Sequence, residues 1–262
     1  MYEFHDLLPR SDVGVTTSVE ALTYNGHILD NEVPGFRTLT VKGRHDFSRD
    51  INAPEMPNDG NLYLDSRIEY RSLKIEFHLR AASVAEFNSA VAKLQQILYQ
   101  PQVQVRFADQ PGYYFIGTAS LSFDEPTINT KGTITITCSD PYRYSDAQTI
   151  SGNGLMDVVI GNSQLTYPVK PKKFQCIAAN SGSSVELYNQ SAGKKFIAHI
   201  AYSAGDTIVI NFADLDFQIN HVSHLMDIDL SSNMEDFFIQ NGNRLTCNVN
   251  GSYSLEYEVK QL

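Results

Sequence analysis

The stretch GTITITCSDPYRYS, residues 132–145, constrains the fold most, because it combines a regular alternation with an abrupt end. Ile134, Ile136 and Cys138 alternate with threonines, which predicts a strand with one apolar face and one hydroxyl face. Pro141 has no backbone N–H and restricts the residue before it, so the hydrogen-bonded ladder cannot continue past this point. The stretch therefore closes a structural unit about halfway along the 262 residues.

One helix is predicted, directly after another alternating strand. Residues 67–80 alternate apolar and charged side chains, which is typical of a half-buried antiparallel strand. Ser83 and Glu86 form a capping-box pattern, in which each side chain satisfies a backbone N–H left unpaired at a helix start. Apolar residues then recur at three- and four-residue spacing as far as Leu98, and Pro101 ends the helix. The stripe favours packing against a sheet, and the alternative is contact with a neighbouring subunit.

The rest of the first half is predicted to consist of strands and one long excursion. The predicted strands are residues 13–22, 37–47, 102–107 and 113–123. Asn25-Gly26 is a tight-turn signal. Residues 48–66 contain Pro54, Pro57 and Gly60 and few apolar side chains, so we interpret them as an exposed excursion in the form of a loose hairpin. Residues 1–145 thus predict an α+β domain with a mostly antiparallel sheet.

From about residue 146 the sequence shows only short strands separated by turns. The apolar alternation covers residues 195–202, 205–212, 244–249 and 253–259. Residues 151–154, Ser-Gly-Asn-Gly, read as a linker, and Asn241-Gly242 and Asn250-Gly251 read as hairpin turns. Residues 146–262 therefore predict a β-sandwich or jelly roll. The predicted fold class is mainly β with one α-helix, in two domains.

Composition and charge exclude several classes of protein. The net charge of −10 argues against a protein that grips nucleic acid through its phosphates. The first residues lack the features of a secretory signal, and no apolar run approaches the roughly 18 residues of a membrane span, so cytosolic folding is expected. Cys138, Cys176 and Cys247 stand far apart in strand-like runs, which indicates reduced core thiols and disfavours zinc.

Motifs for catalysis are missing from the sequence, so we predict no catalytic, cofactor-binding or metal-binding residues and no enzyme. GxSxG, P-loop, HExxH and GxGxxG patterns do not occur. Three pairs stand out as weak candidates for ligands: His221 with His224, Asp214 with Asp216, and Asp227 with Asp229. The histidines lack further ligands, and the D-x-D pairs, although able to hold Ca²⁺, are more often solvated edge residues. A glycosidase needs two carboxylates facing each other across a cleft, which the sequence does not identify.

Aromatic residues of the second half are the candidates for a sugar-stacking platform. They are Tyr188, Phe196, Tyr202, Phe212, Phe217, Phe237, Phe238, Tyr253 and Tyr257. Their even spacing favours core packing for most of them.

In their order, these segments resemble the distal tail protein (Dit) family of long-tailed bacteriophages. RSLKIEFHLRA, the capped helix, VRFADQPGYYFIGTASLSF and GTITITCSDPYRYS follow the family's first domain, which a strand with a DPY-x-Y-like end closes. The sequence departs from that pattern at Thr135 or Ile136, where an aromatic is common. TYPVKP, GDTIVINF, DFFIQNGNRL and YSLEYEV resemble the galectin-like β-sandwich that forms the family's second domain.

The resemblance implies a structural hub at the tip of a phage tail. The first domain would form a hexameric ring that continues the tail tube, and the second would project outward. The implied partners are the tail tube protein, the tail-associated lysin and receptor-binding proteins. The location would be the virion tail tip, after synthesis in the bacterial cytoplasm. No cofactor and no membrane insertion are implied. The excursion of residues 48–66 would reach across to the next subunit of the ring.

In such a ring, the negative charge of the protein would affect the passage of DNA. Six copies at −10 sum to −60, and an electronegative lumen would repel the DNA backbone, so that the genome passes without sticking. Two alternatives stay open. One is a carbohydrate-binding module that recognises a host cell-wall glycan, and the other is a glycan-degrading enzyme.

Overall fold

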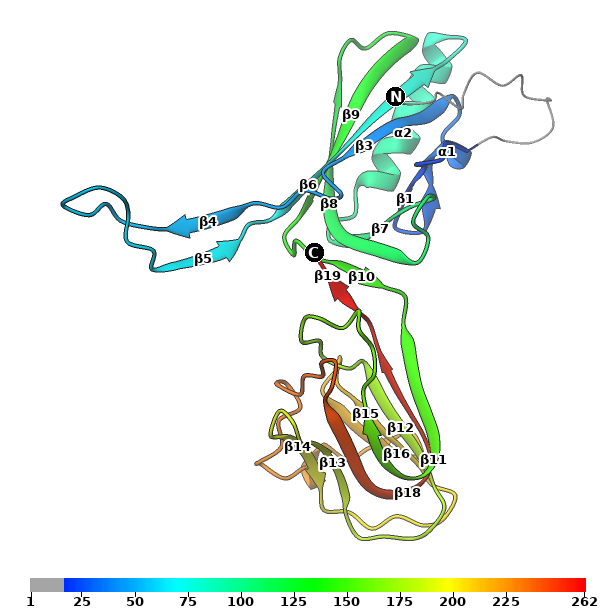
Figure 1. Cartoon of the computed structure of the whole chain (residues 1–262). Helices are drawn as coiled ribbons and strands as arrows, with labels where there is room; N and C mark the ends of the chain where they lie inside the picture. The colour runs from blue at the N-terminus through cyan, green and yellow to red at the C-terminus, as the bar shows by residue number, and fades with distance from the viewer. Residues whose placement is uncertain (1–16) are drawn as a thin grey trace. The chain divides into compact units, whose positions relative to one another are not determined.

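The structure is a computed structural model that describes residues 17–262 (Figure 1). Its chain forms two compact units. The first comprises the residues up to Pro111 together with Phe115–Pro141, and the second comprises Gly112–Tyr114 together with Tyr142–Leu262. Both are built mainly of antiparallel strands, and the first contains the one long helix of the described residues, which confirms the predicted fold class. The predicted domains, residues 1–145 and 146–262, stay a prediction, since compact packing does not show that either part folds alone.

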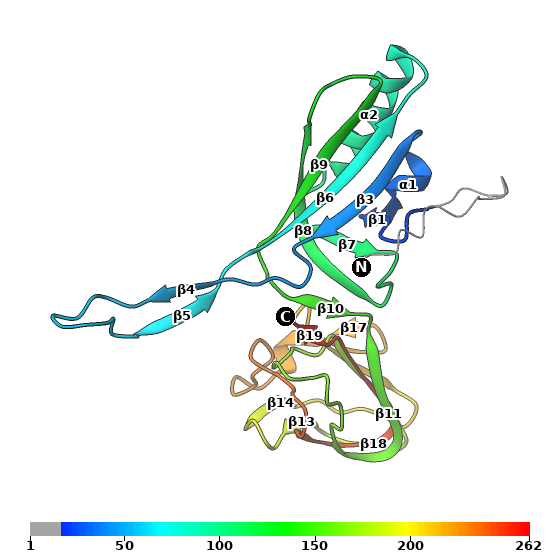
Figure 2. The ribbon, with the colours of Figure 1, turned by 45° about the horizontal axis from the view of Figure 1, so that its top comes forward.

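The first unit is a sheet with one long helix on one face (Figures 1 and 2). Its elements are β1 (Leu22–Tyr24), β2 (His27–Ile28), α1 (Leu29–Glu32), β3 (Phe36–Lys42), β4 (Arg49–Asn52), β5 (Asp65–Ile68), β6 (Arg71–Arg80), α2 (Val84–Leu98), β7 (Val103–Phe107), β8 (Tyr113–Phe123) and β9 (Asn129–Cys138). The strand order is β2-β1-β7-β8-β9-β6-β3, and β4 and β5 form a separate two-stranded sheet. The core lies between α2 and the sheet, where Phe87 and Leu94 pack with Phe77.

The predicted helix is α2. The Ser83 hydroxyl accepts a hydrogen bond from the Glu86 N–H (3.2 Å), and the Glu86 carboxylate accepts one from the Ala82 N–H (2.9 Å). The cap is therefore close to the predicted box, with the returning bond shifted by one residue. The helix ends at Leu98, before Pro101, and its apolar stripe is buried in the core of this unit. Among the described residues no helix is long and apolar enough to span a membrane.

The chain before β1 differs from the prediction of a strand over residues 13–22. Residues 13–16 lie outside the described part, and 17–21 are not a strand, so β1 begins only at Leu22. The reason is a turn in which the Ala21 N–H donates to the Ser18 carbonyl (3.1 Å), which removes both groups from a ladder. Asn25-Gly26 is a turn, as predicted: both residues have positive φ, 50° and 83°, and join β1 to β2.

The second unit contains an eight-stranded antiparallel sheet, β11 to β18, that encloses one core, and β10 and β19 pair with each other outside that sheet. Its elements are β10 (Arg143–Ser145), β11 (Gln148–Val159), β12 (Lys173–Ala178), β13 (Val185–Asn189), β14 (Lys194–Ala198), β15 (Thr207–Asn211), β16 (Asp216–Ile219), β17 (Val222–Ser223), the 3-10 helix η2 (Leu225–Asp227), β18 (Arg244–Tyr257) and β19 (Lys260–Gln261). The long strand β18 pairs with β13 near Cys247 and with β12 from Gly251 to Glu256. This strand therefore belongs to both halves of the sheet, which pack on the same core.

The predicted linker and one predicted turn in this unit are wrong. Residues 151–154 are not a linker but the middle of β11, where Gly152 lies opposite the Tyr253 ring; a Cβ there would approach the Tyr253 hydroxyl to 2.4 Å. Asn250-Gly251 is not a turn, because β18 runs straight through it. In both places glycine makes room for a close neighbour in a sheet and does not provide a turn. Asn241-Gly242 is a turn, with φ 81° at Gly242.

The three cysteines are free and buried, one each in β9, β12 and β18, which confirms the prediction of core thiols. Burial raises the thiol pKa of Cys138 and of Cys247 to about 12, and that of Cys176 to about 11. We therefore expect none of them to react with a thiol reagent at pH 8 in the native protein, and all three to react in denaturant, since only the thiolate is nucleophilic. Mass spectrometry of the labelled protein measures this. Rapid labelling of the native chain would contradict it.

Candidate assembly surfaces

The abrupt end at Pro141 is held by a buried arginine. Arg71 is only 4% exposed, and its Nε donates to the Pro141 carbonyl (2.7 Å). Its Nη1 donates to the carbonyls of Gly43 (3.1 Å) and Arg44 (2.8 Å), and its guanidinium lies 5.5 Å from the centre of the Phe115 ring. One side chain therefore ties the chain after β9 to the chain after β3.

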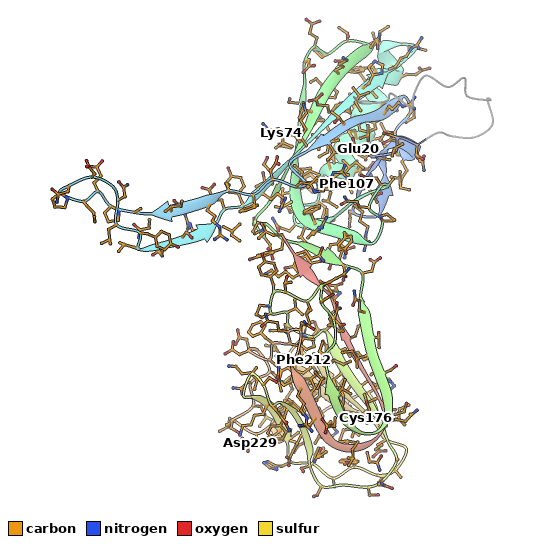
Figure 3. All side chains as sticks on the ribbon, in the orientation of Figure 1. Glu20, Lys74, Phe107, Cys176, Phe212 and Asp229 are labelled. Carbon is orange, nitrogen blue, oxygen red and sulfur yellow. The ribbon has the colours of Figure 1, made fainter. Side chains whose placement is uncertain are left out.

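A second buried arginine lies next to this point. The two Asp109 carboxylate oxygens each lie 2.7 Å from Arg44 Nη1, and Nη2 pairs with the Glu20 carboxylate. The Arg44 guanidinium lies 4.9 Å from the centre of the Phe107 ring. Figure 3 labels Glu20 and Phe107 in this part of the first unit. Arg44 and Arg71 together fix the place where β3 gives way to the excursion.

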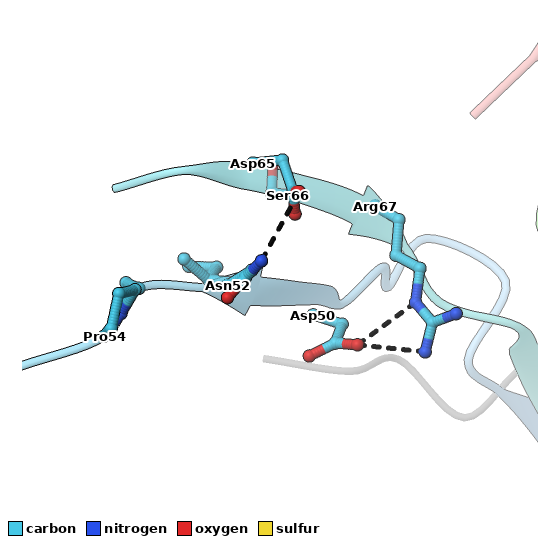
Figure 4. Close-up of a pocket in the computed structure, with 8 residues that line it drawn as sticks. Asp50, Asn52, Pro54, Asp65, Ser66 and Arg67 are labelled. Carbon is cyan, nitrogen blue, oxygen red and sulfur yellow. Dashed lines mark hydrogen bonds and ion pairs between the residues drawn. The ribbon is translucent and has the colours of Figure 1, made fainter. Parts of the chain in front are cut away.

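The excursion is a two-stranded arm, residues 47–70, in which β4 and β5 pair from Arg49↔Ile68 to Asn52↔Asp65. This confirms the predicted hairpin. Figures 1 and 2 both show it leaving the sheet of the first unit. Side chains bridge its strands: Asp50 pairs with Arg67 (3.0 Å) and the Asn52 amide contacts Asp65 (3.5 Å) (Figure 4).

Large apolar side chains of the arm are exposed. They are Phe47, Ile51, Met56, Leu62, Tyr63, Leu64 and Tyr70. A hairpin without a hydrophobic face packed on anything is marginally stable in water. The arm therefore has the composition of a segment that another surface covers.

The sheet of the first unit has a second surface, on the face opposite α2, which we call the hydroxyl face. It consists of Ser72, Thr118, Ser120, Ser122, Thr133, Thr135 and Thr137 with Arg37, Lys42, Lys74, Glu76, His78, Arg80 and Lys131. Figure 3 labels Lys74 on this sheet. Lys42 pairs with Glu76 (2.5 Å), the one carboxylate of the set. With five Lys or Arg residues and one Glu, this face is basic although the protein is acidic.

Both units match known protein families in sequence. Residues 31–138 match the phage tail protein RIFT-related domain, and residues 165–260 match the C-terminal domain of the siphovirus-type tail component. The chain belongs to the siphophage distal tail (Dit) protein family. The predicted resemblance is thereby confirmed for both halves of the chain. No curated protein matches the sequence.

Solved structures share the Dit fold. The crystal structure of SPP1 Dit, described as a paradigm of hub adsorption apparatus in phages that infect Gram-positive bacteria, matches with a TM-score of 0.76 and 16% identity, over 94% of this chain and 100% of that one. Two structures of the phage P2 baseplate in its activated conformation, with Ca and with Sr, match with TM-scores of 0.53 and 0.54 at 8% and 9% identity, over 88% of this chain and 92% of theirs. At these identities the likeness shows a common fold.

The weak ligand candidates do not converge in this Dit family member. His224 Nδ1 lies 3.2 Å from the Asp227 carboxylate, whereas His221 borders a groove on β12, β15 and β16. Asp214 accepts from the Asn211 amide, and Asp216 from Ser223 and Gln218. Within residues 17–262 no three His, Cys, Asp or Glu side chains gather as metal ligands would. Each D-x-D carboxylate is engaged by its own neighbours.

Most of the aromatic candidates belong to the core of the second unit, as expected. Seven are buried: Phe196, Tyr202, Phe212, Phe217, Phe237, Tyr253 and Tyr257. Phe212, labelled in Figure 3, stacks on Phe237 with 5.0 Å between ring centres. Tyr188 is half-buried, and Phe238 is the exposed member of the set.

The two buried arginines were not among the residues that the sequence pointed to. Arg71 had a signal, because it stands at a core-face position of the alternation that continues with Leu73 and Ile75. A charge in register with core residues indicates a buried, hydrogen-bonded group. Arg44 falls within the strand predicted for residues 37–47, but β3 ends at Lys42, and Arg44 lies in the loop that follows. Its burial had no signal in the sequence.

Proposed function

We propose that this protein is a structural hub at the distal end of a siphophage tail. Six copies form a ring that joins the tail tube to tip and receptor-binding components and lets DNA pass. The protein acts by assembly, and not as an enzyme, in a virion whose parts are made in the bacterial cytoplasm. Membership of the Dit family supports the hub role. The observation that carries the ring is the arm, whose apolar side chains are exposed along its length.

The arm suits a heterologous contact, in which two identical copies touch through two different surfaces. If the arm of one copy covers a different surface of the next, the contact repeats head to tail and closes into a ring. A groove of about 290 Å³ at the arm root, bordered by the exposed Phe47 and Tyr70 and by Arg71, is a candidate for that second surface. Asp46 and Glu69 line the same groove, and Arg67 of the arm has the opposite charge.

The arm can be tested with two exposed residues. In Leu62→Ser/Leu64→Ser, we expect each arm contact to lose about 2 kcal/mol, because half-exposed leucines gain that much on burial. This corresponds to a roughly 30-fold weaker contact. For the protein measured alone, light scattering should give a mass near six times 29.3 kDa for the parent and near 29.3 kDa for the variant. With the tail tube protein added, the parent should give the hexamer mass plus the mass of the bound tube protein.

The matched control is Asn58→Ser/Asp59→Asn, at exposed polar positions of the same arm, which should leave the ring intact. Rings of the leucine variant at parental concentration, seen by negative-stain microscopy, would exclude the arm as the assembling element. A parent protein that stays monomeric with the tail tube protein present would exclude the ring itself.

We propose that DNA passes through the channel of the ring without binding to its wall. The hydroxyl face is basic, so a channel lined by that face would have the opposite sign to the predicted electronegative lumen. We propose that other, acidic surfaces of the ring face the DNA. At 150 mM salt we expect assembled rings to retain no double-stranded DNA in a filter-binding assay, because few Lys and Arg contact the phosphates. DNA retention that weakens steeply with salt would instead indicate that the hydroxyl face lines the channel.

A second function, recognition of a cell-wall glycan, is favoured by one observation. A groove of about 410 Å³ on the second unit is lined by hydrogen-bonding side chains, including Gln175, Asn211, Gln218 and Lys173. Amides that donate and accept side by side suit vicinal hydroxyls. Binding of cell-wall polysaccharide that is lost in Gln175→Ala/Gln218→Ala would support this function. Equal binding by parent and variant, or no binding by either, would exclude this groove as a glycan site.

A further inference from the structure

Residues 196–243 of the second unit contain no Lys or Arg and seven Asp or Glu. Within them, the segment of residues 222–230 presents large apolar side chains to solvent. Met226 is 96% exposed and Leu230 is 104% exposed, and Val222 and Leu225 are more than half exposed. We call this segment the acidic knob. Single exposed apolar residues are ordinary, but four within nine positions are not.

The backbone of the acidic knob is held in place on both sides. At its start β17 pairs with β16, with Val222 opposite Ile219. Further along, the His199 N–H donates to the Asp227 carbonyl and the Asp229 N–H donates to the Ile197 carbonyl, both at 2.9 Å. These bonds fasten the knob to the chain around β14.

Side chains add to this anchoring. The Asp229 carboxylate accepts from the Ser231 N–H (2.7 Å) and hydroxyl (2.6 Å) and contacts His199 Nε2 (3.0 Å). These bonds, those of Ser231 first, lower the pKa of Asp229 to about 2, so the anchor stays ionised at neutral pH. Figure 3 shows Asp229 at the surface of the second unit. The knob therefore presents Met226 and Leu230 from a fixed loop.

We propose that the acidic knob is a docking site for a partner protein that offers an apolar socket rimmed by Lys or Arg. This inference rests on the proposed hub function and adds the surface by which the second unit holds a tail component. A preformed loop binds without a large ordering cost. Burying Met226 and Leu230 supplies the apolar contact, and Asp227, which is partly exposed, supplies the charge that selects the socket.

The chemistry of the knob disfavours other occupants. Nucleic acid and anionic lipid surfaces are negative, and the two cations of the neighbouring strand β14, Lys194 and Lys195, stand against seven acidic residues in the stretch 196–243. A second copy of this chain is disfavoured as well, because its basic surface, the hydroxyl face, consists of hydroxyl and charged side chains and offers no apolar socket. Apolar residues with acidic neighbours fit a basic, apolar partner.

The test compares the full-length parent with Met226→Ser/Leu230→Ser. The probes are the purified tail-tip and receptor-binding proteins of the same phage, each measured singly by biolayer interferometry. We expect one of them to bind the parent and to bind the variant at least 30-fold more weakly. Binding by the parent should also weaken between 50 and 500 mM salt, because oppositely charged rims are screened.

The matched control is Leu155→Ser/Val159→Ser, which removes two apolar residues of β11 in the same unit, each more than 60% exposed. It should change binding less than twofold. A photo-crosslinking residue at position 226 should join the knob to a peptide of the partner that carries Lys or Arg.

Several results would overturn the inference. These are equal binding by the parent and the knob variant, no binding of any probe by the parent, or crosslinks to another copy of this chain. The hub function is tested separately by ring assembly. Rings that form normally in a knob variant with unchanged partner binding would exclude the knob and leave the hub standing. Failure of the parent to form rings would exclude the ring and leave the binding result interpretable.

Discussion

Replacing Arg71 by methionine is expected to lower the free energy of unfolding by about 3–5 kcal/mol, because three buried carbonyls lose their donor at about 1–3 kcal/mol each. Methionine keeps the length and the apolar stem of the side chain but donates no hydrogen bond. The carbonyls of Pro141, Gly43 and Arg44 would each lose a charged donor in a buried place. A buried acceptor without its partner costs its full desolvation free energy, which makes this loss larger than that of an exposed ion pair.

Urea unfolding followed by far-UV circular dichroism measures this change, since the chain has no tryptophan for fluorescence. Hydrogen exchange read by mass spectrometry should locate the loss of protection in β3, β6 and β9. The matched control is Arg67→Met in the arm, which breaks an exposed ion pair with Asp50 and should cost less than about 1 kcal/mol. Equal stability of the parent and Arg71→Met would mean that the three carbonyls find other donors.

Gly251→Ala is expected to destabilise the second unit by about 3 kcal/mol. A Cβ at this position would lie 2.0 Å from the Ile177 carbonyl oxygen and 3.1 Å from the Cys176 sulfur. The closest atom belongs to the backbone, so no side-chain rotation can relieve the overlap. The pairing of β12 with β18, in which Ala178 lies opposite Gly251, would have to shift as a whole.

Gly161→Ala is the control for this substitution, because a Cβ there meets no atom within 4 Å and φ is not in the left-handed region. It should change stability by less than about 1 kcal/mol, and a small gain is expected from the less flexible unfolded chain. Thermal unfolding of the two variants gives the comparison. If Gly251→Ala were as stable as Gly161→Ala, the close approach of β12 and β18 would be wrong.

The local elements were predictable from the sequence because each depends on neighbours along the chain. The cap of α2 needs only Ser83 and Glu86 at three-residue spacing, and the helix has both. The alternation around Ile134 and Ile136 places these side chains in the core, as the period of a strand requires. The order of such segments was also enough to indicate the Dit family.

The errors came from residues whose role depends on chain far away in sequence. Gly152 and Gly251 stand in sequences typical of turns or linkers. In the structure the Tyr253 ring approaches Gly152, and the backbone of Ile177 approaches Gly251. Because glycine has no Cβ, it permits both a turn with positive φ and the close approach of another segment. The sequence alone does not show which of these two roles a glycine has.

The sequence by itself determined the strand periods, the one helix, the stop at Pro141 and the buried cysteines, because these follow from local spacing and from the chemistry of single residues. Only the tertiary structure decided that Arg71 captures a carbonyl 70 residues away, that the arm stands free of its own sheet and that Met226 and Leu230 face solvent. The physical reason is that the hydrogen-bond partners and the solvent exposure of a side chain depend on which distant segments of the chain come into contact. The packing of the whole unit determines these contacts.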